Sequence, residues 1–184
     1  MGKPGSDAAA RLAGWLTVIA TGLVAAGSFL PWAKVSIAAQ TLTLRGENVP
    51  IPDLKETVKG TAGFEGWLVI GAGIGLAALC FAFFNGDIAK LRGALFEGLF
   101  IGGVAAWVYF GTLKNAESII DAALGTAVGD LTSQGVPADL AAEVIDKVGR
   151  IVEFNIGIGF WLVVASAGVA VLAGIFAFMA AGSK

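Results

Sequence analysis

Histidine is absent from this 184-residue chain, and its only cysteine is Cys80. The lack of histidine removes the commonest protein ligand for haem, zinc and copper, and the commonest acid–base catalyst near neutral pH. A single cysteine excludes an intrachain disulfide and a cysteine-rich metal site. Because Cys80 lies inside an apolar run, we expect a small buried hydrophobic residue there. We predict no cofactor and no metal.

Charge is also scarce, at 14% of residues, whereas soluble domains carry about 25%. The formal net charge is −2 and the basic residues are scattered, so nucleic acid is not an expected partner. The sequence offers no nucleophile–base pair, no paired carboxylates and no phosphate-binding loop. We therefore expect a protein that is not an enzyme.

Apolar residues make up 57% of the chain, and the mean hydropathy is +0.82. The last long apolar run, residues 156–181, contains no charged residue. About 25 residues at a rise of ~1.5 Å reach ~38 Å, which exceeds the ~30 Å of a bilayer's hydrocarbon core. Similar runs occupy residues 12–30, 67–84 and 94–113. These patterns predict an all-α membrane protein built on a four-transmembrane-helix bundle.

The predicted single domain has eight parts: a cytoplasmic tail (1–11), a first span (12–32), a β-prone extracytoplasmic segment (33–64), a second span (65–84), a cytoplasmic turn (85–93), a third span (94–113), an extracytoplasmic amphipathic helical hairpin (114–150) and a fourth span (151–181). The basic start and the small residues before Pro31 also fit a cleavable signal peptide. The apolar run is long for a signal, so we interpret it as a spanning helix that ends at Pro31.

The first connecting segment alternates apolar and polar residues at 35–37 and 42–44, which favours a small β-hairpin turning near Ala39 and Gln40. Pro50 and Pro52 interrupt the remainder of this segment, and we expect one helical turn at 53–58.

The second connecting segment has the pattern of two amphipathic helices joined by a turn at 133–137, the second of which is expected to run directly into the fourth span. Its apolar stripe is a predicted surface for a partner subunit or lipid and comprises Ile119, Ala123, Leu124, Val128, Leu131, Leu140, Val144, Ile145 and Val148.

The density of Lys and Arg predicts cytoplasmic N and C termini, with both long segments outside. The aromatic residues expected as membrane-interface anchors are Trp15, Trp32, Trp67, Trp107, Tyr109 and Trp161. The lack of an Asn-x-Ser/Thr sequon and the Ala/Gly/Val-rich spans favour a bacterial inner membrane.

Glu97 and Asn155 are candidate intramembrane polar residues. For Glu97 we favour a carboxylate at the start of a helix, reaching headgroup water. Pairing inside the bundle, for which Arg92 is available, and a place on a transport path are the alternatives.

Two small-xxx-small repeats, Gly71/Gly75 and Gly98/Gly102, predict close helix contact. Contact inside the monomer is the favoured interpretation, and contact with a partner chain is the alternative.

The chain passes from its first span through Leu30-Pro31-Trp32 to a β-prone segment, then through two spans joined by a short turn to a second segment and a last span. This order resembles the tetraspan arrangement of claudin-like proteins, which implies a four-helix bundle with two extracellular segments. Claudins carry a Trp…Gly-Leu-Trp…Cys…Cys signature that this first segment lacks. The Gly27-to-Trp32 exit is also similar to that of small four-span bacterial membrane proteins of undefined function.

The sequence leads us to expect a non-catalytic accessory or scaffold subunit that binds other membrane subunits, or copies of itself, and lipids. A small oligomeric channel or transporter using Glu97 and Asn155 is the first alternative. A lipid- or envelope-binding membrane protein is the second.

Overall fold

The computed structural model describes residues 4–38, 40–44, 47–51, 54–113, 116, 120, 132–133, 135 and 137–182. The chain divides into two compact units. The first, which we call the helical unit, comprises Met1–Trp32, Val58–Val108 and Gly157–Lys184. The second, the strand unit, comprises Ala33–Thr57 and Tyr109–Ile156.

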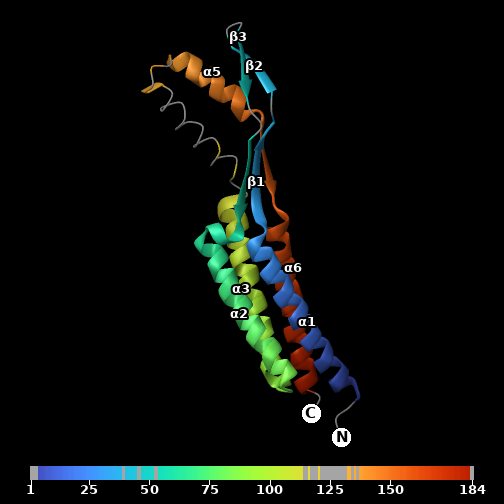
Figure 1. The fold of residues 1–184 in the computed structure, drawn as a ribbon. Coiled ribbons are helices and arrows are strands. Elements are labelled where there is room, and N and C mark those ends of the chain that lie inside the picture. Colours follow the sequence, from blue (N-terminus) through green and yellow to red (C-terminus); the bar gives the residue numbers. More distant parts are fainter. Residues whose placement is uncertain are drawn as a thin grey trace. The chain divides into compact units, whose positions relative to one another are not determined.

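Four long helices form the helical unit: α1 (Pro4–Phe29), α2 (Phe64–Phe84), α3 (Gly93–Val108) and α6 (Ile158–Gly182). Successive helices run in opposite directions, so both chain ends lie at the same end of this unit (Figure 1). The stretches long and apolar enough to cross a membrane are Asp7–Phe29, Phe64–Phe84, Ile88–Gly111 and Ile158–Ala181. The predicted four spans are therefore confirmed at the level of length and composition.

Helix α1 begins eight residues earlier than the expected start at residue 12, because most of the predicted tail is helical. Pro4 suits the first helical position, where its missing N–H costs no hydrogen bond. Asp7 lies in the first turn, where an acid complements the helix dipole, and three alanines follow it. These local preferences extend the helix beyond the apolar run.

Glycine and alanine form the contact between α1 and α6, the most extensive helix pair of the unit. A Cβ atom at Gly27 would lie 2.8 Å from the carbonyl oxygen of Gly159, and a Cβ at Gly159 would lie 2.8 Å from that of Gly27. A Cβ at Gly27 would also lie 2.9 Å from a methyl of Val163, and Ala20, Ala170 and Ala173 are completely buried inside the helical unit. Missing or short side chains thus let the two backbones approach closely.

Among the described residues of the helical unit, three hydroxyl groups are buried, and each is satisfied by its own helix. Thr17 Oγ1 donates to the Ala13 carbonyl at 2.8 Å, Ser28 Oγ to Val24 and Ser166 Oγ to Val163, both at 2.7 Å. This back-bonding removes the cost of a lone polar group in an apolar interior.

The end of α1 is held by Trp32. Its indole Nε1 donates a 2.9 Å hydrogen bond to the Gly27 carbonyl, and its ring meets Phe160 edge-on at a centroid distance of 6.0 Å. The Trp32 carbonyl in turn accepts from the Gly157 N–H at 2.8 Å. Helix α1 stops at Phe29, as Pro31 predicted.

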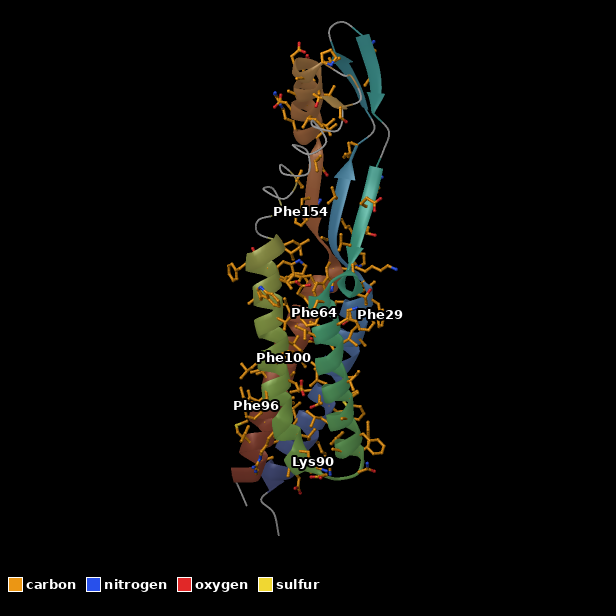
Figure 2. The ribbon with its side chains drawn as sticks, turned by 90° about the vertical axis from the view of Figure 1, so that its left-hand side faces the viewer. Phe29, Phe64, Lys90, Phe96, Phe100 and Phe154 are labelled. Carbon is orange, nitrogen blue, oxygen red and sulfur yellow. The ribbon has the colours of Figure 1, made fainter. Side chains whose placement is uncertain are left out.

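The short connection between α2 and α3 is a 3₁₀ helix, η2 (Ile88–Arg92), and a second one, η1 (Gly60–Ala62), precedes α2. Figure 2 shows Lys90 of η2 at the end of the unit where α2 joins α3. Lys90 pairs there with Asp87 at 2.8 Å. After α3 the chain continues as a π-helix, η3 (Tyr109–Leu113).

Two small sheets contain the strands. One has the order β4–β1–β5 and the other joins β2 to β3. The bounds are β1 (Pro31–Ile37), β2 (Gln40–Leu44), β3 (Glu47–Ile51), β4 (Leu54–Lys59) and β5 (Val152–Ile156). Strand β1 runs antiparallel to β5, with Ala33 opposite Ile156 and Ile37 opposite Val152.

The expected strands at 35–37 and 42–44 are present, but the predicted hairpin between them is wrong. Strand β2 pairs with β3, Gln40 opposite Ile51 and Leu44 opposite Glu47, while β1 pairs with a strand over 110 residues away. The helical turn expected at 53–58 is also wrong, because β4 occupies that stretch and joins β1. Alternating residues identify a strand but do not select its partner.

Helix α5 (Ala138–Gly149) starts after Pro137, and Gly135 takes a positive φ of 91° in the turn before it. The prediction that this helix continues into the fourth span is wrong, because β5 separates α5 from α6. The fourth spanning helix therefore starts at Ile158 and not at residue 151. Pairing with β1 holds the intervening residues in an extended conformation.

The contact between α3 and α6 yields a stability prediction. A Cβ at Gly98 would lie 2.7 Å from the Val171 nitrogen and 2.8 Å from the Ala167 carbonyl oxygen, whereas a Cβ at Gly102 meets only the Ala167 Cβ, at 3.7 Å. We expect Gly98→Ala to lower the unfolding free energy by about 1–3 kcal/mol because backbone must move. Thermal unfolding in detergent measures the difference.

Gly102→Ala is the matched control, one turn further along the same helix, and should leave the unfolding temperature at or above that of the wild type. Equal stability of the two variants would contradict the packing of α3 against α6 described here.

Candidate functional site

Large apolar side chains cover the outside of the helical unit. Helix α2 is the least covered by the rest of the protein, with 22% of its most apolar window buried, against 33–39% for the other three spans. Figure 2 shows Phe29, Phe64, Phe96 and Phe100 on the outer side of their helices. The unit thus presents apolar side chains on several helices, as a surface that meets lipid or another membrane helix does.

One side of α2, which we call the α2 outer face, consists of Phe64, Trp67, Gly71, Ile74 and Phe81. Its four large side chains are 61–71% exposed. A Cβ built at Gly71 meets no atom within 4 Å, so this glycine leaves an open notch between Trp67 and Ile74. Spacings of three, four and seven residues place all five on one side of the helix.

The four glycines predicted to mediate helix contact fall into two groups. Gly75, Gly98 and Gly102 face other helices of the monomer, which is the interpretation favoured from the sequence. A Cβ at Gly71, the first member of its repeat, would lie more than 4 Å from any other described residue. The repeat Gly71/Gly75 is therefore split, since only its second glycine packs inside the monomer.

Glu97 lies on α3, half-buried, with its carboxylate lodged against Gly75 of α2. A Cβ at Gly75 would collide with that carboxylate, so the missing side chain provides its space. The ion pairs found among the described residues do not include one between Glu97 and Arg92, whose guanidinium lies 5.3 Å from the centre of the Phe178 ring. Glu97 thus occupies the α2–α3 contact as a single carboxylate.

The sequence led us to expect Asn155 near the start of the fourth spanning helix, and this expectation is wrong. Asn155 lies in β5, exposed, opposite Lys34 of β1. It also precedes the candidate span Ile158–Ala181 and falls in the strand unit, whereas Glu97 is in the helical unit. The two predicted intramembrane polar residues therefore belong to different units of the chain.

The aromatic residues predicted to anchor the protein at the membrane interface differ in their exposure. Trp15, Trp67, Trp107 and Trp161 are 52–61% exposed, and Tyr109 is half-buried. Trp32, at 5% exposed, is a buried residue of the α1 exit, because its N–H and ring are both engaged inside the helical unit. An indole buried in this way is not available to headgroups.

Of the predicted amphipathic surface, Ile119, Ala123, Leu124, Val128 and Leu131 lie outside the described residues. The other four, Leu140, Val144, Ile145 and Val148, are half-buried on α5. On that helix Lys147 pairs with Glu143 at 2.9 Å and Arg150 pairs with Asp146. The hydrogen bond to Asp146 and its negative charge raise the pKa of Arg150 above its ordinary value.

Sequence reasoning missed the most consequential glycines, Gly27, Gly159 and Gly174. A Cβ at Gly174 would collide with the Leu95 backbone, so α6 approaches α3 as closely as it approaches α1. None of the three belongs to a glycine pair spaced by four. The sequence pattern that marks these glycines is weaker: each is a single glycine on the same side of a helix as buried alanines. This pattern can be recognised only when the partner helix is known.

No three acidic or cysteine side chains gather as a metal site would require within the part of the chain that the structure describes. The chain matches no protein-family model, and no similar sequence is found among curated proteins. The geometry defines a class, a four-helix protein with spans apolar enough to cross a membrane. The claudin-like order of its segments stays a prediction.

Proposed function

We propose that this protein is a non-catalytic accessory subunit of a membrane complex, and that the α2 outer face is where a partner helix packs. The observation that carries this is the open notch at Gly71 on the least covered span. In lipid, helices associate through close packing of their surfaces, and a glycine between large side chains lets a second backbone approach.

The chemistry of the residues supports a binding role over a catalytic one. Glu97, the half-buried carboxylate of the third span, is lodged in a helix–helix contact. Its predicted partner on a transport path, Asn155, lies in another unit. In contrast to these few polar residues, exposed apolar side chains are numerous on the surface of the helical unit.

We further propose that the membrane is a bacterial inner membrane and that both termini are cytoplasmic. Both chain ends lie at one end of the helical unit, together with the connection that carries Lys90 and Arg92 (Figures 1 and 2). An excess of basic residues in short loops favours retention on the cytoplasmic side.

Gly71→Leu tests the contact surface. The monomer has space for the new side chain, so its unfolding temperature should be unchanged or higher, while the notch is filled. We expect the amount of stoichiometric partner that co-purifies in mild detergent to fall about fivefold or more, as the loss of ~1–2 kcal/mol of helix packing implies.

Gly22→Leu is the matched control, since Gly22 of α1 also has no atom within 4 Å of a Cβ, and it should leave co-purification at the wild-type level. Equal losses in both variants would remove the assignment to α2. A monodisperse wild-type monomer with no stoichiometric partner would overturn the accessory role.

Glu97→Gln tests the transport alternative. The substitution keeps the shape that fits against Gly75 and removes the charge. If the protein is an accessory subunit, liposomes containing the variant should have the same proton and cation permeability as liposomes containing the wild type. A wild-type flux that the variant abolishes would instead place Glu97 on an ion path.

Cysteine labelling tests the orientation. The background is Cys80→Ser, in which the serine hydroxyl replaces the thiol that contacts Thr21 Oγ1, and new cysteines replace the exposed Lys34 and Lys90. A membrane-impermeant maleimide added to intact spheroplasts should label position 34, and position 90 only after permeabilisation. The proposal places one membrane span between positions 34 and 90. Labelling of both positions in intact spheroplasts would contradict it.

A further inference from the structure

A pocket of about 230 Å³ lies at the end of the helical unit that holds the chain termini. Three segments line it: the start of α1, the connection η2 and the end of α6. Most of its wall is alanine, and its charged residues are Asp7 and Arg92. Its volume is below the ~300–1,000 Å³ of sites for drug-sized ligands, so it fits a group the size of a lipid headgroup.

Arg92 brings hydrogen-bond donors to this pocket. Its Nε atom is buried and has no hydrogen-bond partner among the described residues. The face of the guanidinium rests on Phe178, 5.3 Å from the ring centre, which orients the planar group without using its N–H donors. Arg92 lines the pocket and its guanidinium carries a permanent positive charge, so an anionic acceptor is the expected complement of its Nη N–H groups.

The position of the pocket along the spanning helices limits which anion can be that acceptor. Its lining residues all lie within the first five residues of the spans Asp7–Phe29 and Ile88–Gly111 or the last five of Ile158–Ala181. Where spanning helices begin and end, the bilayer places its phosphate groups. A phosphate, like a carboxylate, can accept two parallel hydrogen bonds from a guanidinium.

Asp7 sets a second requirement for the ligand. This exposed residue also lines the pocket and carries a charge opposite to that of Arg92. A purely anionic headgroup would be repelled by this carboxylate. A phosphoethanolamine headgroup carries both a phosphate and a primary ammonium, which has three N–H donors to offer a carboxylate. The alanine wall suits the apolar carbons that connect these charges and continue to the glycerol.

We propose that this pocket binds the phosphoethanolamine headgroup of a membrane lipid, with the phosphate on Arg92 and the ammonium on Asp7. The proposal goes beyond the accessory role, since it uses neither the α2 outer face nor a partner subunit.

The experiment is lipid titration of the full-length protein in detergent, followed by native mass spectrometry. Phosphatidylethanolamine should bind more tightly than phosphatidylcholine, whose trimethylated ammonium has no N–H to donate, and more tightly than phosphatidylglycerol, which lacks the ammonium. Arg92→Gln should weaken phosphatidylethanolamine binding about tenfold or more, since it removes a charge-assisted contact. Asp7→Asn should abolish the preference over phosphatidylglycerol.

Lys90→Gln is the matched control, because Lys90 is a basic residue of the same connection, is exposed and pairs with Asp87. It should leave binding unchanged. Equal binding of the three lipids, or wild-type binding by Arg92→Gln, would overturn the proposal.

The Arg92→Gln substitution also removes the contact between Arg92 and Phe178 and could disturb the fold. A second variant therefore tests the pocket without changing either charged residue. Ala181→Leu narrows the pocket and keeps both charges, and it should weaken phosphatidylethanolamine binding with an unchanged unfolding temperature. Free O-phosphoethanolamine should compete with the lipid only at much higher concentration. Tighter binding of the free compound than of the lipid would show that a soluble ligand, and not a membrane lipid, is recognised.

Discussion

The close approach of α1 and α6 is the constraint on which the rest of the helical unit depends. Apolar side chains gain little by leaving lipid for one another, so spanning helices are held together by contact of their surfaces. Here the two backbones approach each other closely at Gly27 and Gly159, and buried alanines lie on both helices. The buried hydroxyls are satisfied within their own helices and therefore do not cross-link the pair.

The same contact explains how strands distant in sequence come to be paired. Helix α1 ends beside the start of α6, where the Gly157 N–H bonds to the Trp32 carbonyl. The chain leaving α1 and the chain entering α6 thus start as neighbours running in opposite directions, and β1 and β5 continue as an antiparallel pair from Ala33 and Ile156. The large loop between them is closed by helix packing rather than by the strands alone.

The glycines of this protein serve two purposes that spacing does not distinguish. Those facing a neighbouring helix, such as Gly98, allow a short distance inside the monomer, and Gly71 leaves a notch on the outside. A glycine exposed on a spanning helix carries a cost in helix propensity of about 1 kcal/mol with no packing in return from its own chain. Gly22 of α1 is open in the same way, and Gly71 differs from it by lying on the least covered span, which is why we assign the partner contact to Gly71. The pocket at Arg92 joins three segments and likewise exists only in the assembled bundle.

The sequence by itself determined the number of spans, the end of α1 shortly before Pro31 and the β character of residues 35–37 and 42–44, because length, hydropathy and alternation are local properties. It did not determine that β1 pairs with β5 and not with β2, that Trp32 is buried, or that Gly75 faces Glu97 while Gly71 faces outward. Only the tertiary structure decided these, since each depends on which surfaces meet across many residues of chain. A repeating pattern identifies the side of a helix or strand that is suited to contact, but the partner is chosen by the packing of the whole bundle.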